Sequence, residues 1–168
     1  MPTTLTTGRL RLVPMPISCA LAKPEDRDAI ARALDANVPD DWPVEHYDQE
    51  MLDHLRALLE KNPDEDYVTR YIVLAETNTV IGMIGSGGPD DDGAVVIGYS
   101  VLPAFQRRGF ASEALTKIIA WCRGDARVRT IAGFTYPHLI ASIKTMEHCG
   151  MRFAGDAAEG TIRYELQM

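Results

Sequence analysis

Apolar and polar residues follow one another along this chain in two patterns, one typical of strands and one typical of helices. Residues 9–13 alternate polar and apolar side chains before a proline, as a half-buried first strand would. Longer apolar runs predict the remaining strands, and a polar turn joins the first two of these runs as a hairpin. The predicted strands after the first are residues 71–75, 80–84, 94–102, 128–135, 151–154 and 161–166.

Apolar residues at helical spacing predict helices before, between and after these strands. Two helices begin at prolines, which are favoured in a first turn, and a third follows the proline-rich loop at residues 37–43, whose Asp40 can cap it. The expected inward positions are Ile30, Ala33 and Leu34, then Tyr47, Met51, Leu55, Leu58 and Leu59, then Ala111, Leu115, Ile118, Ile119 and Cys122, and finally Ile140, Ile143 and Met146. The chain is therefore predicted to be a mixed α/β protein without repeats.

Composition narrows the class of protein. With 168 residues and 46% hydrophobic content, residues 1–168 fit one domain with a core of its own. The net charge of -7 disfavours a general binder of nucleic acid or anionic membranes, so we expect neither as a partner. The three cysteines are unpaired in pattern and the histidines share no metal-ligand spacing, so we expect reduced thiols and no metal. No apolar run approaches a membrane span of roughly 18 residues, and we expect a cytoplasmic protein.

A strand, a short turn and a helix meet in the second half of the chain in a way that favours an anion site. Residues 94–102 predict the strand and residues 111–122 the helix, so the turn between them supplies the first, unpartnered amides of that helix. The helix dipole adds about half a positive charge there. Gly109 lets a ligand approach the backbone, and Arg107 and Arg108 add charge. We therefore expect a phosphate or pyrophosphate at this turn.

This turn and its surroundings resemble the GNAT superfamily of N-acetyltransferases. Gln106-x-x-Gly109-x-Ala111 is similar to the Q/R-x-x-G-x-G/A element with which that family holds the pyrophosphate of acetyl-CoA. The likeness continues in the branch that includes the ribosomal-protein N-terminal acetylases, through Ile97, Gly98, Tyr99, Ala141, Ser142, Ile143, Glu147, Gly150 and Gly155. The resemblance implies an α/β fold with a mixed, mostly antiparallel sheet of six to seven strands, a splayed parallel pair and about four flanking helices.

The resemblance also implies acetyl-CoA as the acyl donor, without a metal. Its pantetheine arm would lie between the splayed strands and pair with strand amides. The residues expected to bind this cofactor are Ser100, Val101, Leu102, Gln106, Arg107, Arg108, Gly109, Phe110, Ala111, Ser112, Leu139 and Ser142. Leu139 stands where relatives usually have an asparagine that bonds to the arm, so this chain departs from the family pattern there.

Acetylation of an amine by a thioester needs a deprotonated amine and a proton for the departing thiolate. Many relatives carry a glutamate two residues before the Gly-Tyr pair as the base, and this chain has Val96 there. Either the amine arrives neutral or another acid serves, with Glu76, Asp90, Asp91, Asp92, Asp40 and Asp41 open. Ser142, which the family places near the thiol, and Tyr99, whose phenol can reach the cleft, are the expected catalytic residues.

The loop at residues 37–43 lies beside the acceptor cleft in the family that the chain resembles. That placement makes Asp41, Trp42 and Tyr47 the expected acceptor-binding residues. The alternative is a packed loop that Trp42 anchors in the core, because buried tryptophan more often packs than binds.

Three functions are consistent with the sequence. The first is transfer of an acetyl group from acetyl-CoA to a primary amine, on a small molecule or a protein N-terminus, by direct attack in a ternary complex. The second is a non-catalytic acyl-CoA binder or sensor, which Val96 and Leu139 favour. The third is an α/β module whose turn binds another phosphate ligand. A monomer and a homodimer are both open.

Overall fold

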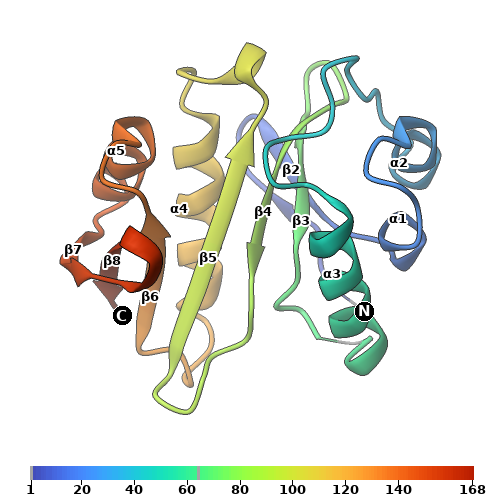
Figure 1. The fold of residues 1–168 in the computed structure, drawn as a ribbon. Helices are drawn as coiled ribbons and strands as arrows, with labels where there is room; N and C mark the ends of the chain where they lie inside the picture. The colour runs from blue at the N-terminus through green and yellow to red at the C-terminus, as the bar shows by residue number, and fades with distance from the viewer. Residues whose placement is uncertain (1, 64) are drawn as a thin grey trace.

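The computed structural model describes residues 2–63 and 65–168, which form an open sheet of eight strands with five α-helices (Figure 1). The strand order is β1-β2-β3-β4-β5-β6-β8-β7. The strands are β1 (Leu5–Thr6), β2 (Leu10–Pro14), β3 (Arg70–Leu74), β4 (Thr79–Ser86), β5 (Ala94–Val101), β6 (Thr130–Thr135), β7 (Arg152–Asp156) and β8 (Ile162–Gln167). The helices are α1 (Ile17–Ala20), α2 (Arg27–Leu34), α3 (Gln49–Lys61), α4 (Phe110–Cys122) and α5 (Ile140–His148).

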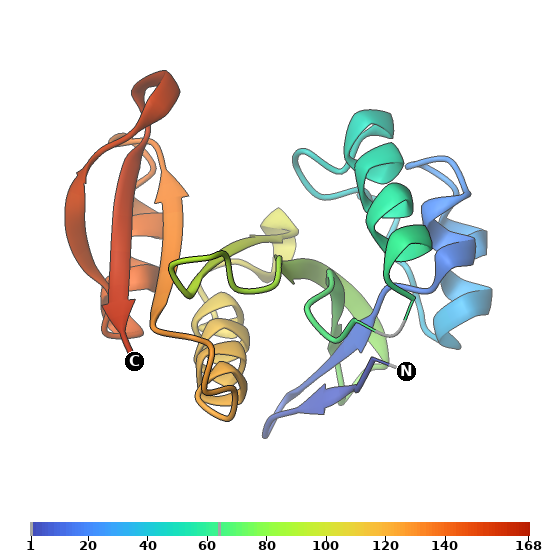
Figure 2. The ribbon, with the colours of Figure 1, turned by 90° about the horizontal axis from the view of Figure 1, so that it is seen from below.

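β3 is buried along its whole length because helices cover both faces of the sheet around it. Side chains of a strand alternate between its faces. Tyr71 and Val73 therefore point into a core shared with α1, α2 and α3, whereas Ile72 and Leu74 point into a core shared with α4. Figure 2 shows α3 and α4 on opposite sides of these strands. This arrangement leaves β5 at the centre of the molecule, beyond the edge of α3.

β5 and β6 are parallel and pair only where they begin. The register joins Ala94, Val95 and Val96 to the first three residues of β6. Farther along, β5 pairs through its other edge with β4, and β6 pairs with β8. The facing edges of the two strands therefore separate after Val96, and the gap between them leads towards the start of α4.

The mixed sheet with one parallel pair confirms the predicted fold class. The strand number exceeds the expected six to seven because the sequence pattern missed β1, a strand of two residues. The described residues also contain five helices rather than about four. None of these helices has the length and apolar character needed to cross a membrane.

Some helix details differ from the predictions for local reasons. Asp48, not Asp40, caps α3, because its side chain accepts the N–H of Met51 at 2.9 Å. Ile140 was expected to face inward but is 53% exposed, since it lies in the first turn of α5 where that helix extends past the core. Ala33 is exposed as well, so Ile30 is the buried residue of α2.

Candidate functional site

The backbone of β5 offers hydrogen-bond groups to the gap beside β6. The N–H of Leu102 donates to the carbonyl oxygen of Ile81 at 2.9 Å, on the side of β4. Because strand N–H groups alternate between the two edges, that of Ser100 also faces β4, and those of Tyr99 and Val101 face the gap. The expectation that the Leu102 and Ser100 amides meet a ligand arm in the gap is therefore wrong, and Val101 alone of the three is suitably placed.

The turn after β5 leaves the first N–H groups of α4 without partners. Within the described chain, no acceptor takes the backbone N–H of residues 107–112, and the first bond of the helix runs from Glu113 N–H to the Gly109 carbonyl at 3.0 Å. Gly109 has a φ of 80°, a left-handed conformation that glycine adopts without strain. Gln106 stabilises the turn, because its Nε2 donates a hydrogen bond to the Val101 carbonyl oxygen at 2.8 Å. We refer to this turn, with the unpartnered N–H groups of residues 107–112, as the cradle.

Three arginines surround this cradle. Arg107 and Arg108, both expected from the sequence, are exposed, and the Arg108 guanidinium lies 5.0 Å from the Phe110 ring centre. Arg9 was missed: its Nη1 donates to the Arg108 carbonyl at 3.1 Å, and a Cβ on Gly109 would lie 3.4 Å from its Nη2. The only local signal was a polar position in the first strand, which does not reveal a partner so distant in sequence.

Tyr99 and Ser142, the expected catalytic pair, are in contact across the gap. The Tyr99 hydroxyl donates to the Ser142 carbonyl oxygen at 3.2 Å and lies 3.4 Å from its Oγ. Burial raises the pKa of Tyr99, and the hydrogen bond with Ser142 offsets part of the effect. Leu139 is 44% exposed at the N-cap of α5, where its side chain makes no capping bond.

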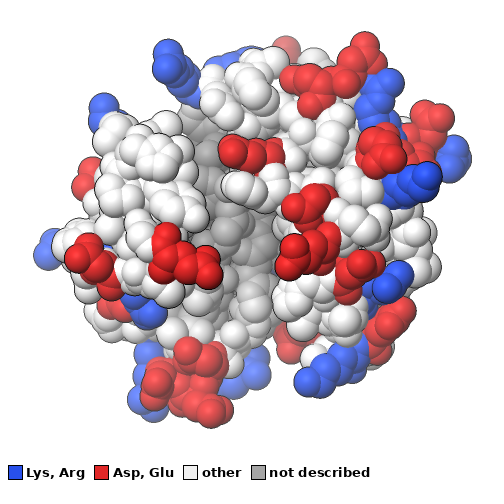
Figure 3. All heavy atoms as spheres, viewed as in Figure 1, with Lys and Arg blue, Asp and Glu red and all other residues white. Residues whose placement is uncertain are grey.

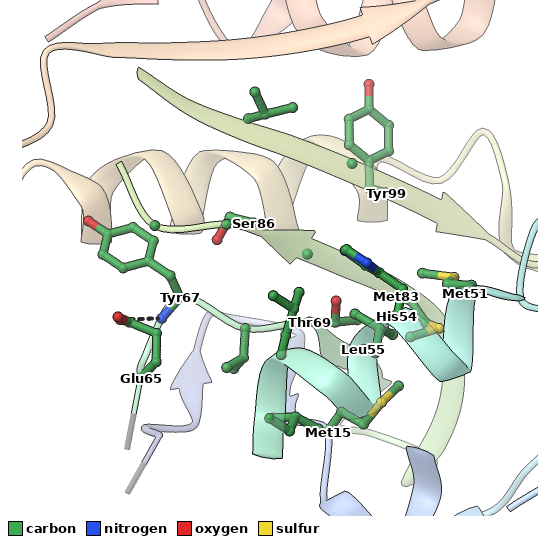
Figure 4. A pocket seen from close by; sticks show the side chains of 18 of the residues that line it. Met15, Met51, His54, Leu55, Glu65, Tyr67, Thr69, Met83, Ser86 and Tyr99 are labelled. Carbon is green, nitrogen blue, oxygen red and sulfur yellow. Dashed lines mark hydrogen bonds between the residues drawn. The ribbon is translucent and has the colours of Figure 1, made fainter. Parts of the chain in front are cut away.

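A cavity of about 700 Å3 lies between α3 and the strands β4 and β5. Figure 3 shows the hollow along the middle of this face, with acidic side chains gathered on the side of α3. Side chains of α3 line one wall, and Val96, Gly98 and Ser100 of β5 belong to the other. In the close view of Figure 4, the Tyr99 side chain extends from β5 on the side away from α3, whereas His54 lies on α3, on the other side of that strand. The cavity thus meets the gap at the middle of this strand.

The profile of the acetyltransferase (GNAT) domain matches residues 20–152, which is most of the chain. The chain belongs to the GNAT acetyltransferase family. A curated relative, the uncharacterized N-acetyltransferase YjdG of Bacillus subtilis (strain 168), is 29% identical over 159 residues, covering 92% of this chain and 93% of that protein. The prediction that this chain is an N-acetyltransferase is confirmed.

Solved structures with the same fold include ribosomal-protein acetyltransferases. A putative ribosomal-protein-serine acetyltransferase from Vibrio cholerae superposes with a TM-score of 0.71 at 17% identity, over 100% of both chains. Mycobacterium smegmatis RimJ in complex with CoA-disulfide superposes with a TM-score of 0.68 at 17% identity, over 99% of this chain and 88% of the other. At such identities the likeness shows that the fold is shared.

The predicted acceptor-binding residues of this acetyltransferase do not line the cavity. Trp42 is 5% exposed and packs edge-on against Tyr47, with ring centres 5.2 Å apart. The hydroxyls of Tyr47 and Tyr71 are 2.9 Å apart, and burial raises the pKa of Tyr47 to about 12. Asp41 is exposed on the loop. None of Asp41, Trp42 and Tyr47 lines the cavity, and Trp42 and Tyr47 have the core positions of the packed-loop alternative.

The carboxylates that the sequence left open as the base also lie outside the cavity lining. Asp90 folds its own turn, because its Oδ1 accepts the N–H of Asp92 at 3.0 Å and of Ala94 at 2.8 Å. Asp40 pairs with Arg27, and Glu76 belongs to the turn between β3 and β4. The ionisable residues that do line the cavity are Glu45, His46, His54, Glu65, Tyr67 and Tyr99.

His54 lines the cavity but is not among the site residues predicted from the sequence, although the sequence carries a signal for it. It lies one turn before Leu58 and one turn after Met51 on α3, the stripe that faces the cavity. Within the described residues, no cluster of three or more His, Cys, Asp or Glu side chains could hold a metal ion.

Proposed function

We propose that this acetyltransferase moves the acetyl group of acetyl-CoA to a primary amine held in the cavity, by direct attack within one ternary complex. The observation that carries the proposal is the meeting of two spaces at residues 98–100: the gap between β5 and β6, which suits an extended arm, and the open cavity beside α3. Two substrates held on either side of one strand segment can react without a covalent enzyme intermediate.

The cradle at the start of α4 fits the pyrophosphate of acetyl-CoA. Its unpartnered N–H groups and the exposed Arg107 and Arg108 supply donors and positive charge at a helix N-terminus. The Val101 N–H is the strand donor available to the pantetheine arm. RimJ of M. smegmatis, which has this fold and was solved with CoA-disulfide, supports a CoA compound as the ligand.

Tyr99 is the group suited to protonating the departing thiolate. Its raised pKa keeps the phenol protonated near neutral pH, and its bond to Ser142 holds it at the gap. Ser142 positions the phenol, and its hydroxyl lies close enough to share the proton.

Acetyl-CoA binding and thiol release test the proposal together. Acetyl-CoA at millimolar concentration should raise the melting temperature by mass action, and Gly109→Glu should abolish that rise through steric block and like charge. Release of the CoA thiol should then depend on an added amine. If the wild-type protein shows neither the shift nor amine-dependent release, the proposal fails.

A second candidate function is an acyl-CoA binder that no longer turns over. The replacements at Val96 and Leu139 favour it, and both side chains are exposed, at 45% and 44%. It predicts the thermal shift with acetyl-CoA but no thiol release with any amine. The open cavity favours the transferase, because a binder has no need of an acceptor space.

A further inference from the structure

The inner wall of the cavity is apolar. Its apolar side chains come from α3, from β4 and from the segments that lead into α1, α3 and β3; they are Met15, Val44, Met51, Leu55, Leu58, Leu59, Val68 and Met83. Methionine side chains adapt to ligand shape, and such a wall stabilises an apolar body. It offers no partners to the several ammonium groups of a polycation, which would lose hydration there without compensation.

Neither of the two glutamates that line the cavity has an unbonded carboxylate inside it. Glu45 is at the mouth, where its side chain is 82% exposed and 3.7 Å from His46. Glu65 stabilises its own turn, because its Oε1 accepts the backbone N–H of Asp66 at 3.0 Å. The same oxygen accepts the backbone N–H of Tyr67 at 3.2 Å (Figure 4). The cavity therefore lacks the buried carboxylate that would attract a second or third positive charge.

The two phenols on the cavity are proton donors rather than acceptors. Tyr67 donates to Asp125 Oδ2 at 3.0 Å, and burial together with that bond raises its pKa. Tyr99 is held by Ser142, and burial raises its pKa too. A neutral phenol with a raised pKa does not take a proton from an ammonium group.

Two imidazoles remain, and His46 is at the mouth of the cavity, where its side chain is 85% exposed, so His54 is the group on the α3 wall. Its imidazole points from α3 towards β5 (Figure 4), and no hydrogen bond or ion pair joins it to another described residue. Imidazole is the side chain that exchanges protons near neutral pH. The titratable groups on its side of β5 are Glu45 and His46 at the mouth, Glu65 and Tyr67 before β3, and Glu50 and Asp53 on α3 itself.

We propose that the acceptor is a monoamine with an apolar body seated against the α3 wall, and that His54 takes the proton from its ammonium group. The inference rests on the proposed function and specifies its acceptor. Ser86 also lines the cavity, and its Oγ is buried without a hydrogen-bond partner in the described chain.

The reaction balances as R–NH3+ plus acetyl-CoA giving R–NH–acetyl, CoA–SH and one proton. His54 accepts that proton and passes it to water. The freed electron pair of nitrogen forms the N–C bond, and the C–S bond breaks with its pair on sulfur. Tyr99 gives its proton to the departing sulfur, and the second proton that the nitrogen loses restores the Tyr99 phenol.

Three acceptors test the apolar wall: 2-phenylethylamine, spermidine, and a short peptide that begins with phenylalanine. We expect kcat/KM for 2-phenylethylamine to exceed that for spermidine by about 10-fold or more. Leu58→Gln should raise the KM for 2-phenylethylamine about 10-fold, whereas Ala57→Gln, on the same helix but off the cavity, should not. A preference for spermidine would overturn the proposal, and activity with the peptide alone would assign the apolar amine to a protein N-terminus.

His54→Gln tests the proton acceptor. At neutral pH it should lower kcat/KM about 10²-fold or more, and the deficit should shrink towards pH 10, where a much larger fraction of an alkylamine is already neutral in solution. Added imidazole should restore part of the rate of His54→Ala. His148→Gln, on α5 and off the cavity, is the matched control. An active wild type with an unchanged pH profile in His54→Gln overturns this inference alone, whereas an inactive wild type overturns the proposed function as well.

Discussion

Arg9 donates from Nε to Glu113 Oε2 at 2.7 Å, so the residue before β2 is bonded to the first turn of α4. The backbone N–H of Arg9 reaches Oε1 of the same carboxylate at 3.0 Å, and the Thr7 hydroxyl donates to Oε1 as well. The Arg9 guanidinium also lies 4.5 Å from the Phe110 ring centre. The N-terminal strand thereby fixes the end of the helix that forms the cradle.

Glu113→Gln tests this connection. Burial alone would raise the pKa of Glu113, but hydrogen bonds from Thr7 and Arg9 lower it. The carboxylate therefore stabilises the fold above the ordinary glutamate pKa of about 4.3, and this stabilisation is lost as the pH falls through its lowered pKa. At pH 7 we expect the variant to lose about 1–2 kcal/mol of unfolding free energy and some affinity for acetyl-CoA.

Denaturant melts at pH 7 and at pH 3 measure the effect. The stability difference between wild type and Glu113→Gln should narrow at the lower pH, where the wild-type carboxylate begins to take up its proton. Glu60→Gln, exposed on α3, is the control. A constant difference across this range would contradict the assignment.

Gly109→Ala tests the backbone of the cradle. A φ of 80° is strained for any residue with a Cβ, so we expect a loss of about 1 kcal/mol in unfolding free energy. A several-fold higher KM for acetyl-CoA should accompany it, since the turn must keep its N–H groups converging. Gly8→Ala is the control, because a Cβ on Gly8 would meet no atom within 4 Å and the φ of Gly8 is not left-handed. Equal effects of the two substitutions on the KM for acetyl-CoA would contradict the proposal that the cradle binds acetyl-CoA.

Hydrophobic pattern predicted most of the fold because burial on one or both faces leaves a signal in the sequence. β3, for example, reads as a continuous apolar run since its side chains enter two cores. The cradle was predictable for a similar reason: a glycine and two arginines mark the strand, turn and helix locally. β1 gave no such signal, because two residues cannot show a period.

Long-range relationships left no local trace. Arg9 and Glu113 are distant in sequence, and the residues around neither of them predict the contact. The acceptor residues stay a prediction: of the two outcomes open for the loop with Trp42, its aromatic rings have the packed one, and side chains of α3 line the cavity. An amphipathic helix shows which stripe is apolar but not that part of the stripe faces an open space.

Tyr99→Phe separates the role of the Tyr99 hydroxyl from that of its aromatic ring. The ring fills the same space, so stability should change little, but the proton for the thiolate and the bond to Ser142 are lost. We expect kcat to fall about 10²-fold with little change in the KM for acetyl-CoA. Stopped-flow measurement of thiol release provides the check, and Ser142→Ala, which keeps the carbonyl acceptor, should cost less. A Tyr99→Phe enzyme with wild-type kcat would leave the thiolate to be protonated by water.

Leu139→Asn should raise the melting temperature and lower the KM for acetyl-CoA. Leu139 is the N-cap of α5 and makes no capping bond, whereas asparagine at that position can accept an N–H of the first turn, a gain of about 1 kcal/mol. This gain corresponds to roughly 2–4 °C in melting temperature for a chain of this size. The resembled family uses an asparagine there to hold the pantetheine arm, so the KM for acetyl-CoA should fall too. Leu139→Gln, whose longer side chain caps poorly, is the matched control. If asparagine raises the melting temperature but leaves the KM unchanged, the cap is real and the arm does not pass this residue.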